Sequence, residues 1–233
     1  MIRTKLKKHQ LLAVKFCVSI YRKLGIFYTG FFSDFGTGKS LMFLAVCEVL
    51  KFKKVLLVSS KTSIETTWPR EIQKHSDYNW MMLLSKTNGV KDRLRNLQLG
   101  LRRCGSVSYG YGDVTVFLIN FEGLRNEVMA KALINAKFDV MCIDESTKIK
   151  DPNAERTKWA WAIGSKIHHK DILTGFPSTE GIHELYSQIK YMDGGKALGN
   201  SYWGFQNKLF VKYGTRLFPH KTAVKWIIKW IIL

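Results

Sequence analysis

The chain has 233 residues, of which 46% are hydrophobic and 24% are charged, so it can bury the core of one large domain or of two small ones. Its 37 Lys and Arg residues against 18 Asp and Glu residues give a net charge of +19. This excess favours a nucleic-acid partner; a basic surface that serves solubility and a site for an acidic protein are the alternatives. No uninterrupted apolar stretch approaches the roughly 18 residues of a membrane helix, and the basic N-terminus lacks the small-residue cleavage site of a signal peptide. We therefore expect a cytoplasmic protein with no membrane partner, whose four cysteines are small core residues in a reducing compartment.

Short apolar segments alternate with helical segments along the chain. A first helix is expected over 9–24, where apolar residues recur at helical spacing up to Gly25. The segments expected after it are a strand at 26–32, a helix at 41–50, a strand at 53–60, a helix at 63–75, a strand at 80–85, a basic helix at 90–103, and strands at 114–120, 138–144 and 170–175. Apolar strands separated by helices predict an α/β fold with a mostly parallel sheet flanked by helices on both faces. We expect one such domain over residues 1–195 and a C-terminal extension over 196–233.

The stretch SDFGTGKS lies between an expected strand and an expected helix, which is the context that a P-loop requires. Gly36 and Gly38 allow the backbone to curl so that successive N–H groups point inward. Lys39 would reach the β and γ phosphates of a nucleotide, and Ser40 would supply a hydroxyl to Mg²⁺. Ser33 stands where the pattern has its first Gly, and a chance Gly-Lys-Ser loop is the alternative interpretation.

A second motif, DVMCIDEST, ends an apolar strand with Asp144 and Glu145. Because the carboxyl ends of parallel strands converge where ligands bind, these acids are expected near the glycine-rich loop. Asp144 would hold Mg²⁺ through water, and Glu145 would polarise the attacking water. An Asp-Glu pair alone carries little information, so the prediction depends on its place after a strand and downstream of the loop.

The order of the motifs resembles lobe 1 of a superfamily 2 helicase, and is most similar to the SWI/SNF-type double-stranded DNA translocases. The matching segments, in the family's order, are LKKHQLLAV, SDFGTGKS, VLLVSSKTSIETTWPREIQKH, VFLINFEGL, IDESTKIKDPNAERTK and LTGFPSTEGIHELYSQIKYMDGG. Two further positions depart from the family pattern: Lys61 stands at a Pro, and Phe176 stands at the second Thr of Leu-Thr-Gly-Thr-Pro. The second departure could loosen the link between ATP and DNA.

This resemblance implies a RecA-like lobe of a P-loop NTPase, with ATP and Mg²⁺ as cofactors and duplex DNA as the partner. Gln10 would read the adenine. The residues implied for nucleotide, metal and catalysis are Gln10, Asp34, Gly36, Thr37, Gly38, Lys39, Ser40, Asp144 and Glu145. Those implied for nucleic acid are Lys61, Thr62, Ser63 and Asn120, through contacts that carry no sequence information.

The family's second RecA-like lobe, with its arginine fingers, has no room in 233 residues. We therefore expect an ATP-binding lobe that hydrolyses ATP weakly unless a second polypeptide supplies lobe 2. The alternative is a non-catalytic nucleic-acid binder derived from such a lobe. A P-loop kinase of a small molecule would lack a lid and would leave the other motifs unexplained.

Each of three further features has more than one interpretation. The basic segment 91–95 is either a DNA-facing patch or a solvated helix face. Tyr109 and Tyr111 either stack on bases or form a plain turn. Trp226 and Trp230, four residues apart, form an apolar stripe that could dock on the lobe, on a partner or on a membrane surface, and we favour protein.

Overall fold

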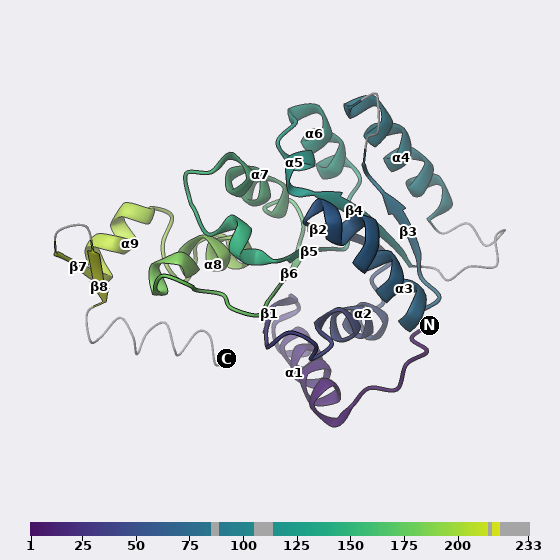
Figure 1. Ribbon diagram of the computed structural model, residues 1–233, viewed down its shortest axis with the longest axis horizontal. Coiled ribbons are helices and arrows are strands. Elements are labelled where there is room, and N and C mark those ends of the chain that lie inside the picture. The colour runs from purple at the N-terminus through teal and green to yellow at the C-terminus, as the bar shows by residue number, and fades with distance from the viewer. Residues whose placement is uncertain (85–88, 105–113, 214–215, 220–233) are drawn as a thin grey trace.

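The computed structural model describes residues 1–84, 89–104, 114–213 and 216–219. Its centre is a six-stranded sheet in which every neighbouring pair of strands is parallel (Figure 1). The strands, in their order across the sheet, are β1 (Tyr28–Phe32), β6 (His169–Thr174), β5 (Val140–Asp144), β2 (Lys54–Ser59), β4 (Thr115–Asn120) and β3 (Asn79–Met82). The expected α/β fold with a parallel sheet is confirmed.

Helices cover both faces of this sheet (Figure 1). On one face lie α1 (Lys8–Leu24), α2 (Lys39–Val49), a π-helical turn (Ser63–Thr67) and α3 (Trp68–His75). On the other lie α4 (Val90–Arg103), α5 (Phe121–Leu124), α6 (Glu127–Asn135), α7 (Glu155–Gly164) and α8 (Leu185–Asp193). Short 3-10 turns occupy Ser146–Ile149 and Ile182–Glu184.

The central strands alternate their side chains between two hydrophobic cores, as the period of two in a strand requires. In β2, Val55 and Leu57 belong to the core under α1–α3, whereas Leu56 and Val58 belong to the core under α4–α8. All four are fully buried. A strand buried on both faces must be apolar throughout, which explains its continuous apolar sequence.

A smaller third core joins α8 to the segment that follows it. Leu185 and Tyr186 pack with Leu198, Phe205 and Phe210. The elements of this segment are α9 (Tyr202–Leu209) and the antiparallel strands β7 (Phe210–Tyr213) and β8 (Arg216–Pro219). Residues on both sides of the expected boundary at 195 therefore share one core.

Within the described ranges, no helix combines the length and the apolar character that crossing a membrane would need. The four cysteines carry free thiols. Cys17, Cys47 and Cys142 are buried as expected, while Cys104 is half-buried.

One carboxyl group lies inside the core beneath α1 and α2. Asp171 on β6 is fully buried, and its Oδ1 accepts hydrogen bonds from the Thr29 hydroxyl (3.1 Å) and the Ile172 N–H (2.9 Å). Its Oδ2 has no hydrogen-bond partner in the described part of the chain. Burial raises the pKa of Asp171 well above its ordinary value, because the charged form loses its hydration.

This buried acid makes a testable contribution to the pH dependence of stability. An unfolded Asp loses its proton near pH ~3.9, whereas the folded protein retains the Asp171 proton to higher pH. The folded state then binds more protons, so the free energy of unfolding falls as the pH rises from that value toward the folded-state pKa. Asp171→Asn should lose less stability between pH 5 and pH 8 than the wild type, as measured by urea unfolding.

Asp77→Asn, at a half-exposed site on the surface, is the matched control and should behave as the wild type does. If Asp171→Asn loses as much stability between the two pH values as the wild type, the titration of Asp171 does not govern this dependence.

Candidate functional site

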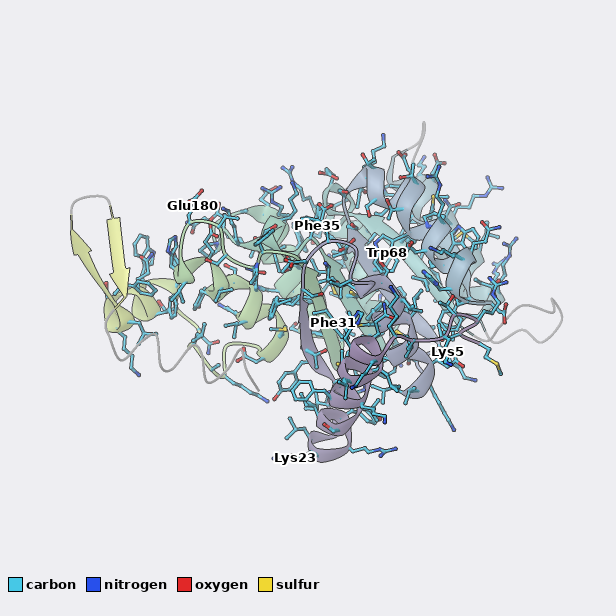
Figure 2. All side chains as sticks on the ribbon, turned by 60° about the horizontal axis from the view of Figure 1, so that its bottom comes forward. Lys5, Lys23, Phe31, Phe35, Trp68 and Glu180 are labelled. Carbon is cyan, nitrogen blue, oxygen red and sulfur yellow. The ribbon has the colours of Figure 1, made fainter. Side chains whose placement is uncertain are left out.

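The glycine-rich loop connects β1 to α2 at the carboxyl edge of the sheet, where Figure 2 labels Phe35. Gly36 (φ 78°) and Gly38 (φ 86°) both have positive φ, which residues with a Cβ adopt only at a cost. The Ser33 and Thr37 hydroxyls lie 2.8 Å apart, and the Thr37 hydroxyl also donates to the Asp34 carbonyl (2.8 Å). These bonds hold the loop in a curl.

Helix α2 begins immediately after this curl, at Lys39. Gly38 is its N-cap, and no side chain of the described residues caps the helix end. The first N–H groups of a helix have no partner within the helix and carry its positive dipole end. The loop and the helix end together have the chemistry of a phosphate site.

The Lys39 ammonium lies inside the curl. It donates to the carbonyl oxygens of Ser33 (2.6 Å) and Asp34 (3.0 Å), and it lies 5.5 Å from the centroid of the Phe35 ring. Burial lowers the pKa of Lys39, while the carboxylates of Asp144 and Asp34 act in the opposite direction. Lys39 follows β1 and Asp144 ends β5, so both motifs lie at the carboxyl edge of the parallel sheet.

Gln10, from α1, is bound to the same loop. Its Nε2 donates to the Thr37 carbonyl (2.9 Å), and its Oε1 accepts the Lys7 N–H (2.9 Å). A Cβ at position 38 would lie 2.3 Å from Gln10 Nε2, so this contact requires the glycine. The structure thus brings Gln10 to the phosphate loop.

Asp144 ends β5 and is oriented by three hydrogen bonds. Its Oδ2 accepts from the Ser59 hydroxyl (3.0 Å) and from Trp68 Nε1 (2.8 Å), and its Oδ1 accepts the Glu145 N–H (3.0 Å). Sequence analysis did not identify Ser59 or Trp68 as partners of Asp144. The signal for Ser59 was its place at the end of β2, the neighbour of β5 in the sheet.

Glu145 has a left-handed backbone (φ 57°), which is uncommon for a residue with a side chain and is found at functional sites. Burial and the neighbouring Asp144 carboxylate raise the pKa of Glu145, while Lys148 and Ser60 lower it. The two adjacent acids therefore differ in environment. One is held by three donors, and the other is exposed beside a negative charge.

A buried hydrogen-bond chain joins the acidic motif to the loop after β6. The Ser146 hydroxyl donates to Gln188 Oε1 (2.6 Å), and Gln188 Nε2 donates to the Pro177 carbonyl (2.6 Å). In the same loop, Glu184 accepts from Lys150 Nζ (2.5 Å) and from the Thr179 N–H (2.6 Å). These residues belong to the motifs of the sequence, but their pairing is not predicted by any of them.

The loop after β6 also contacts the phosphate loop directly. The rings of Phe35 and Phe176 lie 6.4 Å apart and are both exposed (83% and 59%). Phe176 is the residue that departs from the family pattern. In this chain an aromatic contact links the two loops at that position.

The residues predicted to bind nucleic acid have different surroundings. Lys61 and Thr62 are exposed just beyond β2, and Ser63 beside them is half-buried. Asn120 is buried, and its side chain accepts from Arg93 (2.8 Å) and donates to Glu122 (2.6 Å). A direct DNA contact by its amide would have to replace those bonds.

Two features of the sequence analysis fall outside the described residues. They are the turn with Tyr109 and Tyr111 and the stripe with Trp226 and Trp230. The basic segment 91–95 lies on α4, where Arg93 is engaged with the Leu83 carbonyl (3.1 Å) as well as with Asn120.

Comparisons with known proteins agree with this geometry. The profile of the SNF2-related domain matches residues 9–211. Putative protein p41 of Acyrthosiphon pisum secondary endosymbiont phage 1 is 26% identical over 185 residues, which are 75% of this chain and 37% of that protein. The human DNA annealing helicase and endonuclease ZRANB3 is 25% identical over 159 residues, which are 67% of this chain and 13% of that protein.

A solved structure has the same fold. The Sulfolobus solfataricus SWI2/SNF2 ATPase core in complex with dsDNA matches with a TM-score of 0.68 and 20% identity, over 89% of this chain and 39% of that chain. At this identity the likeness supports the fold alone. This chain spans only 13% to 39% of the length of these three proteins. Because the profile covers most of the sequence and the fold agrees with it, the chain belongs to the SNF2-related domain family and forms its N-terminal RecA-like lobe.

Proposed function

We propose that the chain is the ATP-binding lobe of a DNA translocase, which couples binding and hydrolysis of ATP to sequence-independent movement on duplex DNA. The observation that carries the proposal is the placement of Lys39, in the loop after β1, and of Asp144, at the end of β5, at the same carboxyl edge of the parallel sheet. A lysine in a glycine-rich curl, a helix N-terminus and a carboxylate of a neighbouring strand together fit a nucleotide with its metal.

The residues present fit Mg²⁺ because they offer hard oxygen donors. In the described part of the chain, no group of three or more His, Cys, Asp and Glu side chains could hold a metal alone. Mg²⁺ would be held by the Ser40 hydroxyl and the Asp144 carboxylate together with phosphate oxygens, and it would neutralise phosphate charge. The donors from Ser59 and Trp68 keep the Asp144 carboxylate in one orientation.

Lys39 must exchange its two carbonyl partners for phosphate oxygens when a nucleotide binds. An ammonium gains more from a phosphate than from neutral carbonyls, because hydrogen bonds between charged groups are stronger. The exposed Phe35 ring lies beside the Lys39 ammonium, and the exposed Phe176 ring lies beside Phe35. Glu145 is the candidate general base, since its raised pKa improves its match to proton transfer.

Turnover needs positively charged groups beside the transferring phosphoryl group, where they stabilise its negative charge. Arginines in this role raise rates by about 10³–10⁵. We propose that a second polypeptide or segment provides these arginines as lobe 2. More than half of the length of each of these relatives lies outside the matched region, which supports this proposal. The duplex in the complex with the Sulfolobus protein supports DNA as the partner.

Substitution of the phosphate-loop lysine gives the first test. Lys39→Ala should weaken the binding of Mg·ATP at least tenfold in isothermal titration, because a cation facing the phosphates is lost; tenfold corresponds to ~1.4 kcal/mol. Lys74→Ala, on the exposed side of α3, is the control and should bind as the wild type does. Equal binding by Lys39→Ala contradicts the site. No binding by any of the proteins would favour the non-catalytic nucleic-acid binder.

The pH dependence of hydrolysis tests the role of Glu145. In single turnovers of bound ATP, the rate should rise as Glu145 loses its proton. Because its pKa is raised, the midpoint should lie above the ordinary glutamate value of ~4.3. Glu145→Gln should keep nucleotide affinity, lower the rate about 10²-fold or more and remove the rise. Glu127→Gln, at an exposed position on α6, is the control, and an unchanged profile in Glu145→Gln would rule out the assignment.

Binding to duplex DNA should depend steeply on salt. With about 5 phosphate contacts, log K should fall with log salt at a slope near −4 to −5. Lys61→Ala should reduce that slope by about 1. Lys166→Ala, at an exposed site before β6 on the opposite edge of the sheet, should leave it unchanged. Fluorescence anisotropy with a labelled duplex measures all three, and affinity that is insensitive to salt would contradict the phosphate contacts.

A further inference from the structure

Strand β1 is an outermost strand of the sheet, beside which no further strand lies in the described part of the chain. Its only partner there is β6. The ladder begins where the Phe27 carbonyl accepts the Lys170 N–H (2.7 Å). It continues to the Ser33 N–H, which donates to the Thr174 carbonyl (3.3 Å). Odd-numbered residues of β1 therefore direct their backbone groups to β6, because successive residues of a strand alternate the side on which they bond.

The even-numbered residues Tyr28, Gly30 and Phe32 accordingly direct their N–H and C=O groups away from β6. The hydrogen bonds found among the described residues include none to these six backbone groups. Such a row of unpaired groups is a template for another strand, and proteins normally cover or interrupt it.

An apolar groove follows this edge. It has a volume of about 680 Å³ and lies between α1 and α8, with β1 along its floor. Its walls include Phe16, Ile20 and Leu24 from α1 and Ile189 and Met192 from α8. One end reaches Thr37 in the phosphate loop, and the other reaches Lys23, which Figure 2 labels at the far end of α1.

The wall from α1 exposes large apolar side chains. Phe16 and Leu24 are each 49% exposed, on a helix whose Val14 and Cys17 are buried. Apolar side chains on both sides of an unpaired strand favour an occupant that is itself apolar. Lys23 and Asp193, of opposite charge, lie at the far end of the groove.

We propose that this β1 groove binds an extended, apolar strand of a second polypeptide, which becomes the seventh strand of the sheet. Only a backbone satisfies a row of alternating donors and acceptors, and apolar side chains on that backbone would fill the walls of α1 and α8. The relatives have most of their length outside the matched region, so additional chain accompanies this lobe in them. Occupancy of the groove can be tested in the absence of nucleotide.

Amide hydrogen exchange observed by NMR tests the proposal on the full chain. The probe is a labelled nine-residue peptide of alternating valine and threonine with a lysine at each end. In the free protein, the amides of Tyr28, Gly30 and Phe32 should exchange much faster than those of Thr29 and Phe31. The peptide should slow exchange at the three even positions at least tenfold and leave the odd positions unchanged.

Two variants test whether the peptide binds in the groove rather than to any exposed apolar surface. Phe16→Lys should weaken peptide binding at least tenfold, because it puts a charge in the apolar wall. Val49→Lys replaces an equally exposed apolar residue on α2, outside the groove, and should leave binding unchanged. A peptide methylated at every amide should also bind at least tenfold more weakly, since neither of its edges has donors.

Three results would overturn the proposal. One is slow exchange at Tyr28, Gly30 and Phe32 in the free chain, which would show that the chain covers its own edge. Another is a concentration-dependent dimer that is abolished by Phe16→Lys, which would make a second copy the occupant. The third is peptide binding that is unaffected by Phe16→Lys.

Discussion

The site depends on the parallel direction of all six strands. Because each strand ends at the same edge of the sheet, the loop after β1 and the acids after β5 face one another, although β6 lies between the two strands. Lys39 and Asp144 both lie at this edge, where the Asp144 carboxylate acts to raise the pKa of Lys39 against the effect of burial. An antiparallel pairing at any of these positions would send one of the two motifs to the opposite edge.

Hydrogen bonds from neighbouring elements then fix the acids. Asp144 takes donors from Ser59 on the adjacent strand and from Trp68 on α3, so elements distant in sequence hold one carboxylate. Ser146 continues the connection through Gln188 to the loop that carries Phe176. Each bond lies in a buried or half-buried setting, where an unsatisfied group costs about 1–3 kcal/mol. The rings of Phe35 and Phe176 also bring the phosphate loop and the loop after β6 together.

Sequence patterns predicted the elements with strong periodicity and the residues that carry chemistry in a fixed local motif. The helix over 90–103 has the expected bounds. The first strand begins at Tyr28, two residues later than expected, because the Phe27 N–H donates to a His169 ring nitrogen (3.0 Å) rather than to the ladder. The first turn of the helix expected over 63–75 is a π-helix.

The partners of the motif residues could not be predicted in the same way. Trp68 and Gln188 reach the acidic motif only because β2, β5 and α8 pack in a particular register, which no local pattern encodes. The burial of Asn120 has the same cause, since Arg93 approaches it from α4. The apolar groove beside β1 depends on the position of β1 at the edge of the sheet, and strand order is a tertiary property.

A crystal structure with Mg²⁺ and a non-hydrolysable ATP analogue tests the central claim most directly. The account predicts that Lys39 Nζ leaves the carbonyls of Ser33 and Asp34 and lies within hydrogen-bond distance of the β or γ phosphate. It also predicts that the metal lies between Ser40 and Asp144. A structure in which the analogue occupies another surface, while Lys39 keeps its bonds to the loop, would contradict it.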